Sequence, residues 1–203
     1  MWLSDLFVAL ARRFGAKPSQ PGGAVGQLLP IPPSLPPAAV PVAPEQPACP
    51  MTPAEFIAAI VPAAQACMRA TRVPASVTVA QAALESAWGA HAPGHNLFGI
   101  KADTGWSGPV TLQETHEVVD GRTIEMVARF RAYPDWQGSI DDHAAFLAGN
   151  PRYKFAFADP RGPEFAEAIA RAGYATDPVY AAKLKAVMTA HKLCALDLPE
   201  IQP

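Results

Sequence analysis

The chain has 203 residues, half of them hydrophobic, which is enough for one folded domain with additional segments. Its formal net charge is −2 at pH 7, from 16 basic and 18 acidic residues. Nucleic-acid binders usually carry a basic stripe, so this balance argues against that class and fits a neutral or weakly anionic partner.

The first residues, MWLSDLFVALARRF, carry apolar side chains at helical spacing. A secretory signal places its basic residues before a longer apolar run, whereas here Arg12 and Arg13 follow the apolar residues and Asp5 interrupts them. We expect residues 1–17 to form a short amphipathic segment that contacts a membrane surface or a partner, with a weakly ordered terminus as the alternative. No stretch approaches the roughly 20 apolar residues of a membrane-spanning helix.

Residues 18–50 are rich in proline, alanine, valine and glycine. Proline fixes φ and removes a backbone donor, so neither a helix nor a central strand fits this composition. Such a segment favours an extended conformation at ~3.1 Å per residue and could separate its two ends by up to ~100 Å. The sequence therefore predicts a linker over 18–50, a folded domain over 51–197 and a tail over 198–203.

Three cysteines occur, Cys49, Cys67 and Cys194, with no CxxC pair among them. Their spacing argues against a zinc ribbon or a thioredoxin-like motif. We expect Cys67 and Cys194 to be small buried apolar residues. A disulfide that involves Cys194 is the alternative in an oxidising compartment.

Two helices are predicted after the linker. Thr52, Pro53 and Glu55 have the spacing of a capping box with a first-turn proline, so the first helix begins there. A second helix is predicted over 76–89, with Ser76 as its N-cap. Its predicted buried stripe consists of Val77, Ala80, Leu84 and Trp88.

The spacing of apolar residues changes after a loop-rich stretch over 90–109. Residues 110–131 read as two extended runs around Asp120-Gly121, which is a strong signal for a two-residue hairpin turn. Helical spacing then returns over about 137–149, 163–172 and 178–193. The predicted fold class is α+β and mainly α, with one β-hairpin inserted among the helices.

Glu85 is the candidate for acid chemistry. It lies in AQAALESAWG and is the only charged residue from Val73 to Gly89. An apolar setting disfavours the charged carboxylate, so such a group stays protonated near neutral pH and can donate a proton to a leaving oxygen. The alternative is an ordinary surface glutamate on an amphipathic helix.

Five stretches resemble a known family in their order and spacing: AQAALESAWG, HNLFGIK, FRAY, NPRY and AGYATDPVYAAKL. Together they resemble the glucosaminidase family of peptidoglycan hydrolases, which includes the C-terminal domain of a flagellar peptidoglycan hydrolase, autolysins and phage lysins. The resemblance covers about residues 53–192. It implies a lysozyme-like fold, an endo-β-N-acetylglucosaminidase activity that cuts after N-acetylglucosamine, and Glu85 as the general acid.

The same resemblance implies a second glutamate in the hairpin. The matching residue is Glu117, in ETHEVVDG, with Glu114 as a weaker candidate three residues earlier. Its expected role is to stabilise an oxocarbenium-like transition state or to activate a water. The alternative is a solvated strand residue, and the sequence leaves a retaining, an inverting and a substrate-assisted mechanism open.

Four further residues match the family's substrate cleft. Tyr174 matches an aromatic near the acid that holds an acetamido group or stacks on a sugar, with a core residue as the alternative. Asn96 is expected to bind sugar or to lock its loop, and Phe98 to pack. Asp142 is expected to supply supporting hydrogen bonds, whereas Tyr180 reads as structural.

A metal site is not expected. His91 and His95 are four residues apart, but Pro93 and Gly94 lie between them and prevent a shared helix face. Three consecutive ligands, in residues 141–143, would point in divergent directions. We therefore expect neither a catalytic metal nor a cofactor.

The sequence leaves three functions open: a glucosaminidase; a lytic transglycosylase or muramidase on the same fold; and a cell-wall-binding module without activity. The expected partner is the glycan strand of peptidoglycan, with peripheral membrane contact by residues 1–14 and no nucleic acid. The expected place of action is the bacterial cell wall or periplasm. A phage lysin and a bacterial enzyme with a non-standard export route both fit this organisation.

Overall fold

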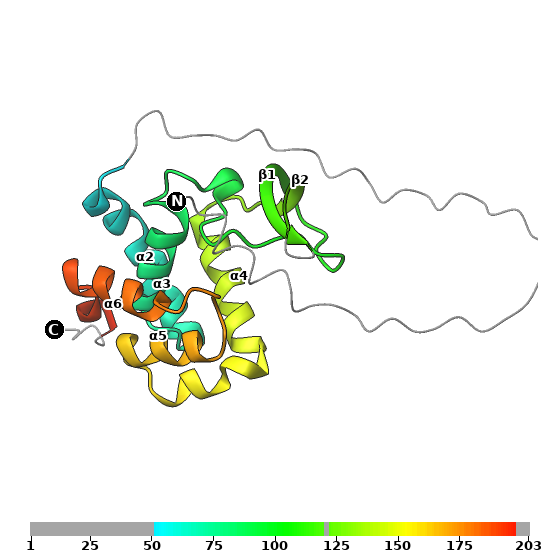
Figure 1. The fold of residues 1–203 in the computed structure, drawn as a ribbon. Coiled ribbons are helices and arrows are strands. Elements are labelled where there is room, and N and C mark those ends of the chain that lie inside the picture. Colours follow the sequence, from blue (N-terminus) through cyan, green and yellow to red (C-terminus); the bar gives the residue numbers. More distant parts are fainter. Residues whose placement is uncertain (1–50, 120–121, 198–203) are drawn as a thin grey trace, which may run out of the picture.

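The computed structural model describes residues 51–119 and 122–197 (Figure 1). The predicted amphipathic segment, the linker with Cys49, the turn Asp120-Gly121 and the tail lie outside these residues. Within the described part, no helix combines the length and apolar character needed to cross a bilayer.

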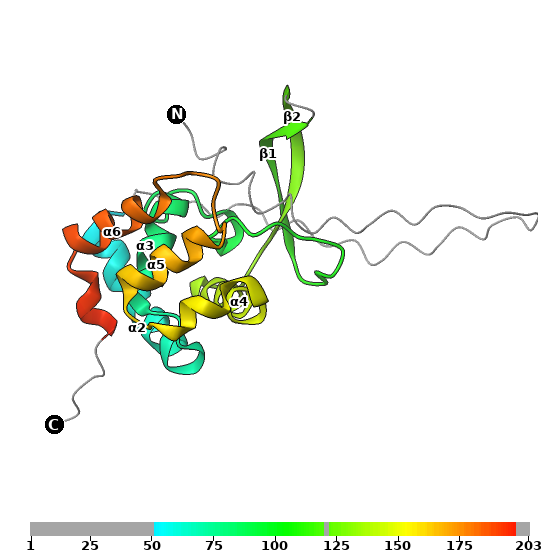
Figure 2. The same ribbon diagram turned by 60° about the horizontal axis from the view of Figure 1, so that its bottom comes forward.

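Helices form one body, and a two-stranded antiparallel hairpin projects from it (Figures 1 and 2). This arrangement confirms the prediction of a mainly helical domain with an inserted hairpin. In chain order, the elements are α2 (Pro53–Thr71), α3 (Ala75–Ser86), η1 (Pro93–His95), β1 (Val110–Val119), β2 (Arg122–Arg131), α4 (Trp136–Gly149), η2 (Pro151–Ala158), α5 (Gly162–Arg171), α6 (Tyr180–Ala190) and η3 (Leu193–Asp197). The 3₁₀ segments η2 and η3 were not predicted.

The capping box of α2 is present as predicted. The Glu55 amide donates to the Thr52 hydroxyl at 3.3 Å, and the Thr52 amide donates to Glu55 Oε2 at 2.8 Å. These bonds satisfy amide groups that the first helical turn leaves without a partner. The apolar face of α2, with Phe56 and Ile60, is then fully buried in the core.

Helix α3 lies at the centre of the body and is buried on nearly every side. The prediction of a single buried stripe was therefore wrong: Leu84 and Trp88 are only partly buried, while Gln81, Glu85 and Ser86 are buried. A helix whose side chains are mostly small and apolar on every face can take a central position. The acid consequently lies inside the body.

The start of α3 differs from the prediction as well. Pro74, and not Ser76, is the N-cap residue, and it has no side chain that could cap. Asp197 supplies the cap from η3: its Oδ1 accepts from the Ser76 amide at 2.8 Å, and its Oδ2 accepts from the Ser76 hydroxyl at 2.6 Å. Gly162 packs so closely against this pair that it has no room for a side chain.

The two cysteines within the described residues differ in their burial. Cys67 is buried in the core, as predicted, whereas Cys194 is exposed, so that prediction was wrong. Cys194 lies on η3, where Leu193 is the residue that reaches the core.

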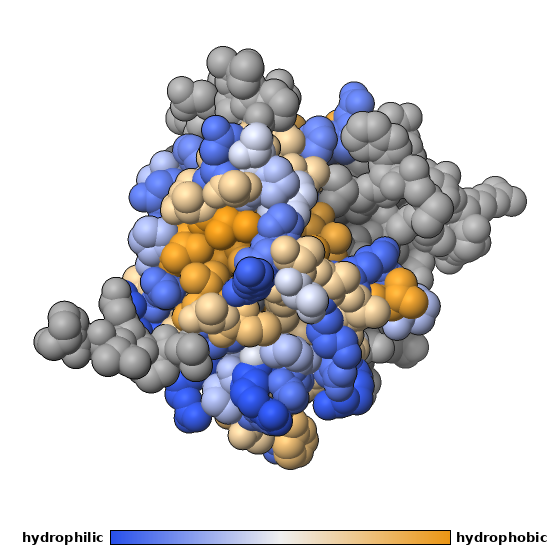
Figure 3. All heavy atoms as spheres, turned by 90° about the vertical axis from the view of Figure 1, so that its left-hand side faces the viewer, coloured by the Kyte–Doolittle hydropathy of each residue, from blue (hydrophilic) through white to orange (hydrophobic). Residues whose placement is uncertain are grey.

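On the face of the body away from the hairpin, an apolar area is bordered by hydrophilic residues (Figure 3). Partly buried apolar residues of the body include Val61 and Val187.

The hairpin register runs from Val110 opposite Arg131 to Val119 opposite Arg122, so two residues join the strands, as predicted. Its base is attached to the helical body. Arg131 donates its amide to the Ile100 carbonyl at 2.9 Å, and the side chain of Phe130 is buried. The hairpin is thus anchored at its base.

Candidate active site

Glu85 lies in the last turn of α3 and is 6% exposed. Burial raises the pKa of its carboxyl to about 8, and a hydrogen bond from Tyr180 opposes this effect only in part. The carboxyl is therefore protonated at neutral pH, which is the state that a general acid needs.

The backbone turns sharply just after this residue. Helix α3 ends at Ser86 rather than at the predicted Gly89, because Ala87 and Trp88 adopt left-handed φ values of 49° and 61°. The Ser86 hydroxyl donates to the Ala82 carbonyl at 2.6 Å and accepts from the Gly89 amide at 2.8 Å. This local network fixes the helix end that carries the acid.

Tyr180, from α6, contacts the acid directly. Its hydroxyl donates to Glu85 Oε1 at 2.9 Å and accepts from Gln81 Nε2 at 2.9 Å. The interpretation of Tyr180 as structural missed this contact, and Gln81 was not singled out at all. Both residues lie in matched stretches of the sequence, but no local pattern distinguishes a packed tyrosine from one that reaches a buried acid.

Tyr174 lies beside Tyr180, with the two rings stacked at a centroid distance of 5.5 Å. Its hydroxyl lies 2.9 Å from His143 Nε2, and the His143 ring stacks on Phe98 at 3.9 Å. The structure thus brings Tyr174 into the neighbourhood of Glu85. Phe98 is buried and packs, as expected.

Asn96 is 3% exposed and locks its loop. Its Nδ2 donates to the carbonyls of Ile100 and Arg131, both at 2.9 Å, and its Oδ1 accepts from the Ile100 amide at 3.0 Å. Both N–H groups are used within the protein, so of the two expected roles the structure supports loop locking.

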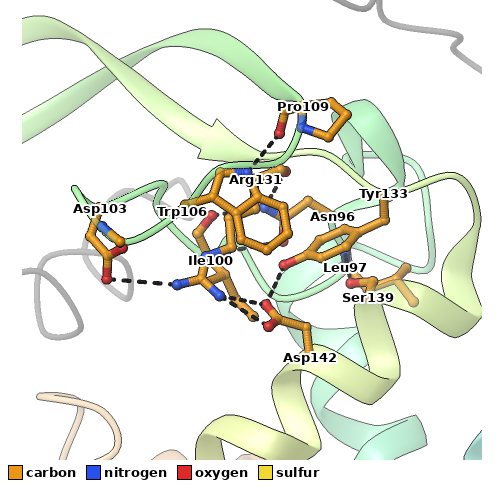
Figure 4. A network of polar contacts seen from close by, with 11 residues as sticks. Asn96, Leu97, Ile100, Asp103, Trp106, Pro109, Arg131, Tyr133, Ser139 and Asp142 are labelled. Atoms are coloured by element: carbon orange, nitrogen blue, oxygen red, sulfur yellow. Dashed lines mark hydrogen bonds and ion pairs between the residues drawn. The ribbon is translucent and has the colours of Figure 1, made fainter. Parts of the chain in front are cut away.

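Asp142, on α4, holds the base of the hairpin (Figure 4). Its carboxylate accepts two bonds from Arg131 Nη1, at 3.0 and 2.9 Å, and one from the Tyr133 hydroxyl at 2.7 Å. The Arg131 guanidinium also lies over the Trp106 ring, 4.7 Å from its centroid. We call these four residues the hairpin clasp. Its hydrogen bonds are of the supporting kind expected of Asp142, whereas substrate binding by Asp142 stays a prediction.

We predict that Asp142→Ala lowers the free energy of unfolding by about 1.5–3 kcal/mol, because it removes the carboxylate that accepts from Arg131 Nη1 and from the Tyr133 hydroxyl. Urea denaturation measures this loss. The matched control is Asp141→Ala, which removes a neighbouring exposed carboxylate that accepts from Gln137. Equal losses in the two variants would contradict a stabilising role for the clasp.

The two hairpin glutamates lie on β1, with Glu117 opposite Ile124 and Glu114 opposite Val127. Glu114 is exposed, and the side chain of Glu117 lies outside the described residues.

Within residues 51–119 and 122–197, no cluster of three or more histidine, cysteine or acidic side chains could hold a metal ion.

A cavity of about 590 Å³ opens beside Pro74 and Cys194. It lies at the opposite end of α3 from Glu85, so it is separate from the site around the acid.

Comparison with protein families gives one match over residues 61–193, to the glucosaminidase family, described as mannosyl-glycoprotein endo-β-N-acetylglucosaminidase. The chain is 41% identical over 138 residues to peptidoglycan hydrolase FlgJ of Pseudomonas aeruginosa, covering 64% of this chain and 34% of that protein. It is 38% identical over 136 residues to exo-glucosaminidase LytG of Bacillus subtilis, covering 63% and 47%. The chain thus spans less than half the length of these relatives.

Solved structures share the fold. The glycoside hydrolase domain of Salmonella typhimurium FlgJ, truncated at its C-terminus, has a TM-score of 0.62 at 36% identity, covering 70% of this chain and 98% of that one. The catalytic domain of the autolysin Auto from Listeria monocytogenes has a TM-score of 0.65 at 29% identity, covering 75% and 92%.

Proposed function

Because this chain belongs to the glucosaminidase family of glycoside hydrolases, we propose that it hydrolyses the β-1,4 bond after N-acetylglucosamine in peptidoglycan. The observation that carries the proposal is the burial of the Glu85 carboxyl at the end of α3, which raises its pKa to about 8. The substrate is inferred from relatives named as peptidoglycan hydrolases. The place of action that follows is the bacterial cell wall or periplasm.

In the proposed reaction, Glu85 transfers its proton to the glycosidic oxygen as the bond to the sugar carbon breaks. The electron pair of that bond leaves with the oxygen, and the sugar ring acquires oxocarbenium character. Glu85 becomes a carboxylate, which the Tyr180 hydroxyl stabilises through its hydrogen bond to Oε1. Tyr174 is proposed to line the cleft at the acetamido group of the substrate.

Digestion of purified peptidoglycan by the wild-type protein, followed by mass spectrometry, tests the proposal. The expected products carry a reducing-end N-acetylglucosamine. A reducing-end muramic acid would identify a muramidase, and an anhydro end would identify a lytic transglycosylase. An inert wild-type chain that still binds the wall would identify a binding module. Each of these three results would overturn the proposal.

Glu117 is proposed as the second carboxylate, which stabilises the charged transition state or activates water. We predict that Glu117→Gln lowers kcat by about 10²-fold, the lower end of the range for such groups. Glu114→Gln is the matched control on the same strand and should retain activity. Kinetics on peptidoglycan with both variants measure this difference, and equal effects would remove Glu117 from the mechanism.

A further inference from the structure

Gln81 lies one helical turn before Glu85 on α3, and Tyr180 of α6 contacts both side chains. Gln81 Nε2 donates to the Tyr180 hydroxyl at 2.9 Å, and that hydroxyl donates to Glu85 Oε1 at 2.9 Å. Residues four apart on a helix lie on the same face, so one side chain from α6 can bridge them. Gln81 and Tyr180 are fully buried, and Glu85 is 6% exposed. The orientation of each group therefore depends on its protein partners.

The direction of the two hydrogen bonds depends on the Gln81 amide. A tyrosine hydroxyl has a single hydrogen to donate. When this hydroxyl accepts from Gln81 Nε2, its own hydrogen goes to Glu85 Oε1. If the amide oxygen faced Tyr180 instead, the hydroxyl would donate to Gln81, and the protonated Glu85 would donate to the hydroxyl. The transferable proton of the acid would then point into the core and away from a substrate.

Burial favours the first of these arrangements. Gln81 Oε1 is buried without a hydrogen-bond partner among the described residues. With the amide reversed, the same position would hold the NH₂ group, and two buried donors would lack an acceptor. Unpaired buried donors are rarer than acceptors that are left unused. The amide nitrogen of Gln81 therefore faces Tyr180.

We propose that Gln81 is a positioning residue for the reaction, because its amide makes the Tyr180 hydroxyl a donor to Glu85. Oε1 of Glu85 is then an acceptor, so the proton of the neutral acid lies on Oε2. Within the described part of the chain, no hydrogen bond occupies Oε2, which leaves that proton available to the glycosidic oxygen. As the proton leaves, Gln81 strengthens the donation from Tyr180 to the new carboxylate, since consecutive hydrogen bonds polarise one another. This inference rests on the proposed function of Glu85.

The test replaces Gln81 with methionine, which has nearly the same length and no donor. On peptidoglycan, Gln81→Met should lower kcat about fivefold with KM nearly unchanged, the effect of one lost hydrogen bond. Gln65→Met is the matched control, because Gln65 lies on α2 and donates to the Leu196 carbonyl of η3 at 3.5 Å. This control should keep wild-type kcat. A wild-type kcat in Gln81→Met would overturn the inference.

Two readouts separate positioning from a general loss of stability. The fall of activity on the alkaline side should move to higher pH by about 0.5 pH unit in Gln81→Met, because a weaker donor to the carboxylate raises the pKa of Glu85. In a Tyr180→Phe background, Gln81→Met should cause no further loss of kcat, because the hydroxyl that connects the two residues is absent. An unchanged alkaline limit, or losses that add, would contradict a positioning role.

Carbon NMR of the Glu85 carboxyl in the full chain provides a test without activity. This carboxyl should titrate at higher pH in Gln81→Met than in the wild type. In the wild type, the side-chain amide signals of Gln81 should shift with the same midpoint as the carboxyl. Amide signals that stay constant through this titration would overturn the inference even if the variant does not fold. Failure of the proposed function is distinguishable, because the wild-type chain would then release no reducing-end N-acetylglucosamine, whatever the NMR titrations show.

Discussion

Glu85→Gln is expected to lower kcat on purified peptidoglycan by about 10²–10⁴-fold, the range that general acids contribute. Glutamine has nearly the same shape and still accepts from Tyr180, but it has no proton to give. For the same reason, wild-type activity should fall as the pH rises through about 8, where Glu85 loses its proton.

Turbidity loss and product release over a pH series measure both effects. Glu164→Gln is a suitable control, because Glu164 pairs with Arg161 near the start of α5, away from the acid. Full activity of Glu85→Gln would remove Glu85 from the mechanism. An alkaline limit that persists unchanged in a partly active Glu85→Gln variant would assign that limit to another group.

The same substitution is expected to stabilise the fold increasingly as the pH rises. The pKa of Glu85 is about 8 in the folded protein and near its ordinary value of 4.5 in the unfolded chain. Between these values the unfolded chain has lost a proton that the folded protein retains, so wild-type stability decreases with pH by at most about 1.4 kcal/mol per unit. The contribution of the protonated Glu85 carboxyl to the free energy of unfolding is complete below pH 4.5 and is lost above about pH 8.

Urea denaturation of the wild type and Glu85→Gln at several pH values within this window measures the effect. The difference in unfolding free energy should grow in favour of glutamine as the pH rises, because glutamine does not titrate. Glu164→Gln should show no comparable pH-dependent gain. A constant difference between wild type and Glu85→Gln would mean that the folded protein accommodates the charged carboxylate.

Local sequence was sufficient to predict the main helices and the hairpin and to single out Glu85 as the candidate acid. The capping box at Thr52 and Glu55 marks the start of α2, and Asp120-Gly121 marks the turn that the strand register requires. Each signal works because its physical cause lies within a few neighbouring residues. Glu85 could be proposed as the acid because an acidic residue among small apolar ones is visible in the sequence, and because the surrounding stretches resemble a family.

Contacts between distant segments could not be derived in this way. Asp197 caps α3 from 121 residues away, which is why Ser76 was misassigned as the N-cap. Cys194 was expected to be buried because cysteine usually is, but its exposure depends on how η3 lies on the body. In both cases the deciding partner belongs to another element.

The sequence by itself determined the main helices and the hairpin and singled out Glu85 as the candidate acid, because periodicity, capping and turn chemistry are local. Only the tertiary structure decided the state of that acid. Its protonation follows from burial inside a central helix, and its orientation follows from Tyr180, which lies 95 residues further along the chain. A pKa depends on the desolvation and the hydrogen bonds that surround a group in space, and packing of separate helices creates both.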